Sequence, residues 1–229
     1  MFAAALAAAP GCSGPPRPDL ERLYAQQANP GGQPPVVLIH GLLGGRFAER
    51  GGEREVWPGT VARLMFSDYR DLALPIDPET LTPADSGLEV TGLTDRAAGR
   101  DFYGAILDVL EVAGGYRRAA PGRAAGPGEK RVYVFAYDWR QDNVRTAAKL
   151  DAFLARIRDD YGDPDLRVDV IAHSMGGMLV RYYLRYGTAD VLDDNDFPVT
   201  QAGAAGIRRV ILLGTPSLGS VSAVIGLLE

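Results

Sequence analysis

The sequence predicts an α/β protein, with a mostly parallel sheet and helices on both of its faces. Apolar runs of strand length, rich in β-branched residues, occur at 34–41, 131–139, 166–172 and 207–216. Between these runs lie segments whose apolar residues recur at helical spacing, at 101–113, 142–161 and 174–187. Strands that alternate with helices imply parallel strands joined by crossover helices, and unbroken apolar runs indicate strands buried on both faces.

The sequence marks some elements more clearly than others. Two helices carry one apolar stripe each, made of Phe102, Ile106, Val109, Leu110 and Ala113 in the first and of Ala147, Leu150, Leu154, Ile157 and Tyr161 in the second. We expect 42–60 to be a polar, glycine-rich loop, 60–66 to open a helix, and 71–76 and 88–93 to form short strands. We expect a loop at 116–130 and an irregular insertion at 188–206.

Length, charge and cysteine usage exclude several classes of protein. A chain of 229 residues fits one domain with a sizeable core. The net charge is −5, with 24 basic and 29 acidic residues mixed along the chain, so the sequence lacks the basic face of a nucleic-acid binder. The single cysteine, Cys12, excludes an internal disulfide and metal sites built from cysteine clusters. No apolar stretch reaches the ~20 residues that a membrane span requires.

Residues 1–33 are expected to be a leader and a tether, separate from a domain at 34–229. Cys12 follows the apolar start MFAAALAAAPG and precedes SGPPRPD, an order that resembles a bacterial lipoprotein signal. The apolar run is short and no Lys or Arg precedes it, so the alternative is a disordered leader with an incidental cysteine. The first interpretation predicts a protein of the bacterial cell envelope or a secreted one, lipid-anchored at Cys12; the second leaves a cytoplasmic protein.

Ser174 lies where a predicted strand meets a predicted helix. The surrounding residues are Ala172-His173-Ser174-Met175-Gly176, with Gly177 next. They match the G-x-S-x-G nucleophile elbow, with alanine in place of the first glycine. A strained turn exposes such a serine, and small residues two positions away avoid clashes, so we predict that Ser174 is a nucleophile. The alternative is a helix N-cap serine followed by packing glycines.

A second glycine-rich motif, HGLLGG at 40–45, follows the first predicted strand. A tetrahedral intermediate needs preorganised N–H donors for its oxyanion. We predict that the backbone N–H of Met175 supplies one and that of Leu42 the other, with Leu43 as second choice, while Gly41 lets the backbone approach the substrate. The alternative is a strand end that turns through glycines. A phosphate-binding loop is excluded because no lysine follows the motif.

The remaining members of a catalytic triad are missing from the expected places. In this arrangement the order along the chain is serine, acid, histidine. The only histidines are His40, which precedes Ser174, and His173, whose side chain should point away from it. We predict structural roles for both. Acidic candidates do not follow a later strand either: they are Asp138 before the serine, and Asp190, Asp193, Asp194 and Asp196 in the insertion. We therefore expect the front part of a longer enzyme, without the triad acid and histidine.

The motifs together resemble a known family. PPVVLIHGLLG, VWPGT, YDWR, AHSMGGMLVRYYL and LLGTPSLG occur in this order. They are similar to the lecithin:cholesterol acyltransferase-type, lipase-like branch of the α/β-hydrolase superfamily, over about residues 34–219. The resemblance implies an α/β-hydrolase fold that lacks its last strands, and acyl-ester hydrolysis or O-acyl transfer on lipids. It also implies contact with a membrane or lipid surface, and no metal or organic cofactor.

The resemblance also suggests roles for three further residues. It places Trp57 near the substrate entrance, although packing in the core is an equally open interpretation. It places Asp138 and Arg140 at the C-terminal edge of a strand, where they fix loop geometry. Two other functions stay open: a triacylglycerol lipase or small-ester carboxylesterase of the same fold, and a non-catalytic binding or scaffold protein that keeps the serine turn as architecture.

Overall fold

The computed structural model describes residues 18–20, 22–23, 32–80, 82–192, 197–221 and 225. Its centre is a five-stranded sheet with the strand order β10-β9-β1-β8-β7, and each neighbouring pair is parallel. The strands are β1 (Val36–Ile39), β7 (Arg117–Ala119), β8 (Arg131–Phe135), β9 (Val168–His173) and β10 (Ile207–Leu213). The predicted parallel α/β architecture is confirmed.

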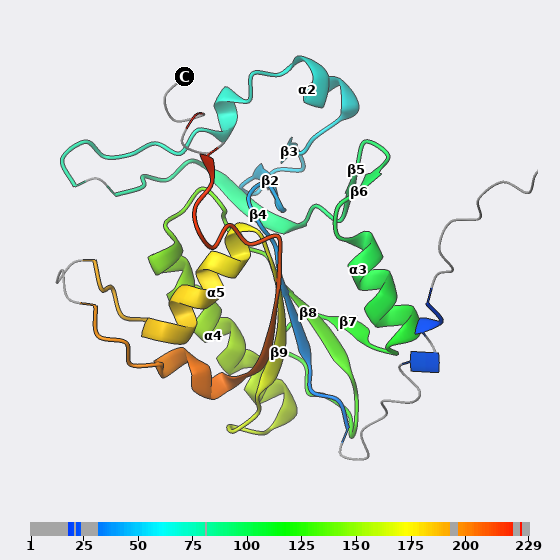
Figure 1. The fold of residues 1–229 in the computed structure, drawn as a ribbon. Coiled ribbons are helices and arrows are strands. Elements are labelled where there is room, and N and C mark those ends of the chain that lie inside the picture. Colours follow the sequence, from blue (N-terminus) through cyan, green and yellow to red (C-terminus); the bar gives the residue numbers. More distant parts are fainter. Residues whose placement is uncertain are drawn as a thin grey trace, which may run out of the picture.

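Helices cover both faces of this sheet (Figure 1). On one side lie α4 (Asn143–Tyr161) and α5 (Met175–Tyr186); on the other lies α3 (Gly104–Asp108), which continues as the π-helical turn η2 (Val109–Ala113). The four residues of β1 alternate between two core clusters: Val37 and Ile39 pack with the α4 and α5 side, Val36 and Leu38 with the α3 side. All four are buried, which explains why this strand has no polar alternation.

The expected loop at 42–60 is wrong, because this segment contains two strands. An antiparallel sheet is formed by β2 (Gly45–Glu49), β3 (Glu55–Trp57) and β4 (Leu88–Leu93), in the order β3-β2-β4. Phe47 and Val56 are fully buried there. The two strands are too short to show a period, and β4, the partner that completes them, comes some forty positions later in the sequence.

The segment between β3 and β4 confirms one prediction and corrects another. The expected helix is present as α2 (Val61–Phe66), capped by the Thr60 side chain. The expected strand at 71–76 is wrong: the 3-10 turn η1 (Arg70–Leu72) occupies its start, and Ile76 forms only an isolated bridge with Pro83. A small hairpin of β5 (Arg96–Ala97) and β6 (Arg100–Asp101) then leads into α3.

Three further boundaries differ from expectation. The predicted loop at 116–130 begins with β7, an edge strand whose arginines hide the strand pattern, since an edge strand need not be apolar. Strand β8 ends at Phe135, four residues before the predicted end. The insertion is irregular as predicted, apart from the 3-10 segment η3 (Ala202–Gly206).

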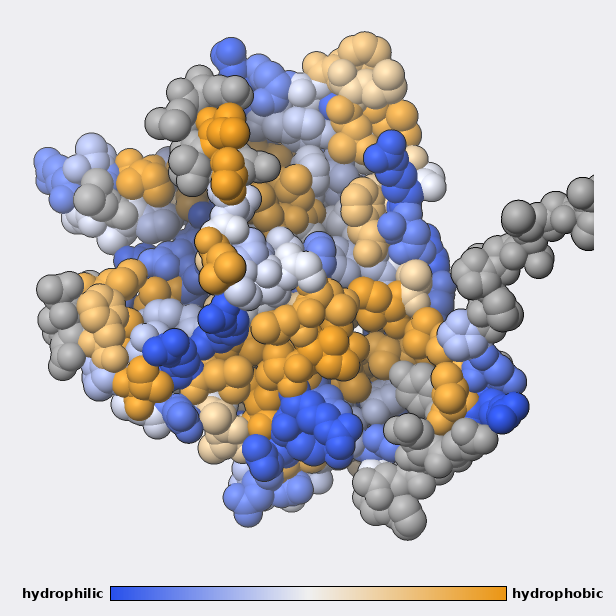
Figure 2. Space-filling view, viewed as in Figure 1, coloured by the Kyte–Doolittle hydropathy of each residue, from blue (hydrophilic) through white to orange (hydrophobic). Residues whose placement is uncertain are grey.

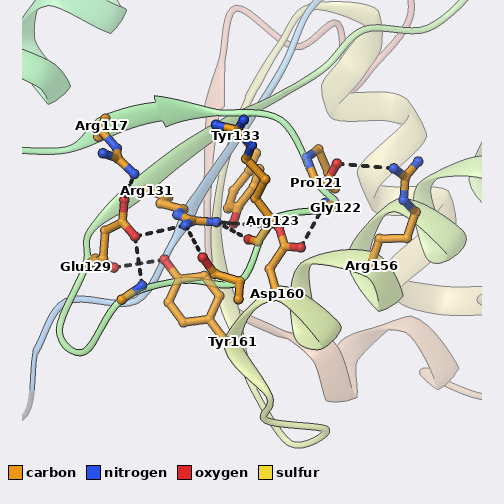
Figure 3. A network of polar contacts seen from close by, with 12 residues as sticks. Arg117, Pro121, Gly122, Arg123, Glu129, Arg131, Tyr133, Arg156, Asp160 and Tyr161 are labelled. Atoms are coloured by element: carbon orange, nitrogen blue, oxygen red, sulfur yellow. Dashed lines mark hydrogen bonds and ion pairs between the residues drawn. The ribbon is translucent and has the colours of Figure 1, made fainter.

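A buried charged cluster closes the loop after β7 onto the sheet (Figure 3). Arg131, whose side chain is 3% exposed, donates to the carbonyl oxygens of Arg123 (2.6 Å) and Ala124 (2.7 Å). Asp160 accepts hydrogen bonds from the Gly122 N–H (2.8 Å) and the Tyr133 hydroxyl (3.1 Å). Because Arg131 begins β8, this cluster lies at the opposite end of the sheet from the C-terminal strand edges and serves as a structural anchor.

Several predictions concern residues outside the described part of the chain. Cys12, most of the leader at 1–33, and Asp193, Asp194 and Asp196 belong to this group. Within the described ranges, no helix is long and apolar enough to cross a membrane.

Candidate active site

Ser174 occupies a strained turn between the end of β9 and the start of α5. Its backbone has φ 52° and ψ −122°, a combination that costs a non-glycine residue about 1–3 kcal/mol. The Ser174 N–H donates to the Leu213 carbonyl at 2.8 Å, which ties the turn to the end of β10. The Ser174 side chain makes no capping hydrogen bond to α5. The N-cap alternative therefore has no hydrogen bond to support it.

The small residues around Ser174 permit close packing of α5 on the sheet. A Cβ atom on Gly176 would lie 2.9 Å from Ile39 Cγ2 and 3.0 Å from the Ile39 carbonyl oxygen. A Cβ atom on Gly177 would overlap the Thr215 hydroxyl. Ala172, which stands where the elbow pattern has a glycine, is fully buried. The helix thus starts directly against β1 and the segment after β10, where larger side chains would not fit.

The loop after β1 touches the serine turn. A Cβ atom on Gly41 would lie 2.7 Å from Ser174 Cβ and 3.1 Å from the His173 carbonyl oxygen. Residues 41–44 form a turn in which the Gly44 N–H donates to the Gly41 carbonyl at 3.1 Å. Leu43 adopts φ 64° within this turn. Only a residue without a side chain at position 41 allows the loop and the serine turn to approach this closely.

Two backbone N–H groups beside Ser174 have no acceptor among the residues that the structure describes. Met175 is the first residue of α5, so its N–H has no partner within the helix. The Leu42 N–H makes no hydrogen bond within the described part of the chain. The structure thus brings together, from distant parts of the sequence, two segments that each carry an N–H without an acceptor among the described residues.

His40 is fully buried and both of its ring nitrogens have partners. Nδ1 lies 2.8 Å from the Gly41 carbonyl oxygen, and Nε2 accepts the Tyr137 N–H at 3.1 Å. The imidazole stacks on the Tyr137 ring with a centroid separation of 4.3 Å. Burial lowers the pKa of His40 to about 4, so the ring is neutral at pH 7.

His173 also has a partner other than the serine. Its Nδ1 lies 2.8 Å from the hydroxyl of Tyr103, and burial lowers its pKa. No hydrogen bond joins the Ser174 hydroxyl to either histidine, although all three residues lie in the described part of the chain. The His40 ring thus holds backbone groups of Gly41 and Tyr137, whereas the His173 ring binds a side-chain hydroxyl, and both have the partners of structural histidines.

Asp138 and Arg140 form a paired carboxylate and guanidinium after β8. Arg140 Nε and Nη2 donate to the two Asp138 oxygens at 2.9 Å and 2.8 Å. Burial alone would raise the pKa of Asp138, but its hydrogen bonds with Arg140 lower it below the ordinary value. Arg140 also donates to the Leu72 carbonyl and the Ser86 hydroxyl, both at 3.1 Å. The pair therefore fixes loop geometry, as expected.

Trp57 lies beside the Gly41–Gly44 turn. Its indole Nε1 donates to the Leu43 carbonyl at 2.8 Å, and its ring contacts Tyr69 and Trp139 edge to face. It is half-buried, so it both packs against aromatic neighbours and supports the turn. Among the described residues, no three His, Cys, Asp or Glu side chains converge closely enough to hold a metal ion.

Comparison with known proteins identifies the family. The family model described as lecithin:cholesterol acyltransferase matches residues 82–229, which include the serine turn and both helices that flank β9. The chain belongs to the lecithin:cholesterol acyltransferase family. Its central parallel sheet with helices on both faces is accordingly an α/β-hydrolase fold.

A plant member of the lecithin:cholesterol acyltransferase family gives a second match. Lecithin-cholesterol acyltransferase-like 4 of Arabidopsis thaliana is 26% identical over 175 residues. The match covers 66% of this chain and 30% of the plant protein, so the chain spans about a third of that relative.

The family's motifs pointed to the serine turn and the glycine loop, but not to the side chains that hold them. Tyr103 links Gly41 to His173, and Tyr137 holds His40. Tyr103 stands in none of the motifs, and although Tyr137 opens the YDWR motif, the motif does not indicate that this residue holds His40. Both contacts join residues more than sixty positions apart, so no local signal could have revealed them.

Proposed function

We propose that Ser174 is the nucleophile of a lipid acyl-ester hydrolase or O-acyltransferase, with the Leu42 and Met175 N–H groups as its oxyanion hole. The observation that carries this proposal is the contact between two segments: Gly41 lies against Ser174, and each segment presents an N–H without an acceptor beside it. Strained backbone at Ser174 supports it further, because such strain concentrates at functional sites. Family membership supports acyl-ester chemistry.

The proposed reaction has two halves. Ser174 Oγ attacks the acyl carbonyl while a general base takes its proton, and the oxyanion of the tetrahedral intermediate accepts hydrogen bonds from Leu42 and Met175. Collapse expels the alcohol, which takes up the proton, and leaves an acyl-serine. Water or a second alcohol then attacks the acyl-serine, which releases a fatty acid or a new ester. Since His40 and His173 have other partners, the general base comes from outside these two residues.

An acyl lipid held at a lipid surface suits the apolar rim of the site. This rim consists of exposed apolar side chains of the loop after β1 and of α2, which include Leu42, Val61, Met65 and Phe66, with Phe66 83% exposed. Figure 2 shows apolar side chains gathered over α2 at the top of the molecule. We propose that this rim meets the lipid. The same site would serve a triacylglycerol lipase or a small-ester carboxylesterase, which differ in substrate size only.

A non-catalytic binding role is the second candidate, and one observation favours it. Both histidines of the chain are engaged with other groups, so the described serine turn has no base of its own. In that case the turn and the glycine loop would serve as architecture around a bound lipid.

Hydrolysis of p-nitrophenyl butyrate separates these candidates. We expect the 229-residue chain and its Ser174→Ala variant to hydrolyse the ester at equal, low rates, because an unassisted serine retains only binding and the oxyanion hole. Because neither histidine is free to act as base, we propose that the triad acid and histidine belong to a longer product of the same gene, called the complete gene product below. It should exceed the 229-residue chain by roughly 10³-fold or more, since loss of a triad histidine typically costs about 10⁶ in turnover. Strong Ser174-dependent turnover by the 229 residues alone would show that His40 or His173 acts as base. A complete product without Ser174-dependent turnover would favour the binding role.

The sequence also supports a proposal on localisation. We propose that Cys12 becomes a lipidated N-terminus in a bacterial envelope, because an apolar run precedes it and a proline-rich tether follows. Mass spectrometry of the mature protein from its native host should find a diacylated or triacylated cysteine. An unmodified N-terminus upstream of Cys12 would contradict this.

A further inference from the structure

The peptide unit between Gly41 and Leu42 carries the proposed oxyanion donor. The Gly41 C=O and the Leu42 N–H belong to one planar unit and point in opposite directions. Any group that fixes the direction of this carbonyl therefore also fixes the direction of the Leu42 N–H. A rotation of this peptide would turn the donor away from Ser174 without moving either neighbouring Cα atom far.

His40 holds the carbonyl side of this peptide. Its Nδ1 lies 2.8 Å from the Gly41 carbonyl oxygen, which can only accept a hydrogen bond. Its Nε2 faces the Tyr137 N–H at 3.1 Å, which can only donate. The two partners together require the neutral tautomer with the proton on Nδ1, and the parallel stacking on Tyr137 prevents the ring from turning.

Tyr103 holds the other side of Gly41. The buried Tyr103 hydroxyl accepts the Gly41 N–H at 2.9 Å and lies 2.8 Å from His173 Nδ1. The hydroxyl proton then has one acceptor nearby, His173 Nδ1, so the proton of His173 is on Nε2. The result is a chain of hydrogen bonds from Gly41 through Tyr103 to the residue next to Ser174, which connects the glycine loop to the serine turn.

We infer that His40 and Tyr103 are positioning residues for the reaction proposed above: they clamp the two backbone groups of Gly41 so that the Leu42 N–H stays directed at the oxyanion. This inference rests on the proposed function of Ser174. Trp57 and Gly44 add to the clamp, since Trp57 binds the Leu43 carbonyl and the Gly44 N–H binds the Gly41 carbonyl.

Two substitutions at position 40 separate orientation of the peptide from simple packing. The amide nitrogen of asparagine stands where Nδ1 stands, so His40→Asn can still donate to the Gly41 carbonyl. The amide of glutamine reaches the place of Nε2, so His40→Gln can accept the Tyr137 N–H but not hold Gly41. Tyr103→Phe removes the clamp on the Gly41 N–H and leaves the ring in place. Tyr183→Phe is a matched control because Tyr183, on the face of α5 that packs against α4, is also a buried tyrosine and the substitution removes its hydroxyl hydrogen bond to Asp151.

Steady-state kinetics of the complete gene product provide the first test. A donor that acts only on the oxyanion affects kcat and leaves KM nearly unchanged. Since removal of one donor costs about 10²–10³ in turnover, we expect His40→Gln and Tyr103→Phe to lower kcat by about 10- to 100-fold, with KM within about two-fold. His40→Asn should recover most of the loss, and Tyr183→Phe should match the wild type. Equal kcat for wild type, His40→Gln and Tyr103→Phe would overturn the inference. A rise in KM with an unchanged kcat would also overturn it.

Nitrogen-15 NMR of the 229-residue chain provides the second test, and it does not depend on turnover. With two histidines, the spectrum holds two imidazoles, and we expect His40 with its proton on Nδ1 and His173 with its proton on Nε2. Tyr103→Phe removes the hydroxyl that fixes the His173 tautomer, so His173 should then populate both neutral tautomers, while His40 should keep its proton on Nδ1. An Nε2-protonated His40 would overturn the inference even if Ser174 is the nucleophile. If Ser174→Ala retains full turnover in the complete product, the proposed function is wrong, and this spectrum alone then decides whether the clamp exists.

Discussion

Acidification from pH 7 to pH 5 should destabilise the folded chain through His40. Burial lowers the folded-state pKa of this residue to about 4, whereas an unfolded histidine titrates near 6.5. Between these values the unfolded chain binds a proton that the folded chain excludes, because protonated Nε2 would face the Tyr137 N–H. The stabilisation is therefore complete above about pH 6.5 and is lost as the pH falls toward 4.

The size of the effect follows from the two pKa values. Each pKa unit corresponds to about 1.4 kcal/mol, and at pH 5 the gap between the solution pH and the unfolded pKa is 1.5 units. The free energy of unfolding should therefore fall by about 2 kcal/mol between pH 7 and pH 5. This window lies above the range in which carboxylates titrate, so their contribution stays small there.

Urea unfolding at pH 7, 6 and 5 measures this term when the wild type is compared with His40→Gln. The variant lacks the titrating ring, while His173, whose pKa burial also lowers, contributes equally to both proteins. We expect the difference in unfolding free energy between the two proteins to shrink by about 2 kcal/mol over this range. A difference that stays constant with pH would show that His40 is not buried in the neutral form and would refute the reasoning.

Three further predictions concern close approach and buried charge. Gly41→Val should lower kcat of the complete gene product by about 10²–10³, because any Cβ atom there meets Ser174; unchanged turnover would contradict the placement of the donor. Gly177→Ala should lower the unfolding free energy by about 1–3 kcal/mol in urea titrations, because overlap with the facing threonine outweighs the better helix propensity of alanine; a more stable variant would contradict this. Asp160→Ala should cost about 3–5 kcal/mol, since it leaves the buried Arg131 guanidinium with one carboxylate fewer; a thermal midpoint close to that of the wild type would show that the cluster is not the anchor we describe.

The predicted part of the fold is the part with strong local periodicity. Strands β1, β9 and β10 and helices α4 and α5 all lie where apolar runs and stripes placed them. The strands that the sequence missed are short or edge strands: β2 and β3 owe their strand structure to the sheet that β4 completes, and β7 owes its to β8. Such strands are stabilised by cross-strand partners, so a short window of sequence does not contain the cause of their structure.

The residues of the candidate site also fall into two groups, those that local sequence indicates and those that only distant contacts bring in. A sharp turn at Ser174 requires small neighbours, and this requirement is visible in the sequence as Ala172, Gly176 and Gly177. The glycines after β1 are visible for the same reason. Nothing local indicates that Tyr103, 62 positions from Gly41, would hold this loop.

The sequence by itself thus determined the order of β1, β8, β9, β10, α4 and α5, the serine turn and the count of two histidines, because these depend on residues close together in the chain or on a count. Only the tertiary structure decided that His40 holds two backbone groups and His173 the Tyr103 hydroxyl, rather than Ser174. It also decided that the Leu42 N–H has no acceptor among the described residues. The physical reason is that the role of a buried polar group is set by its hydrogen-bond partners. In this fold, packing against the sheet brings those partners from distant segments to within 3.1 Å of the two rings.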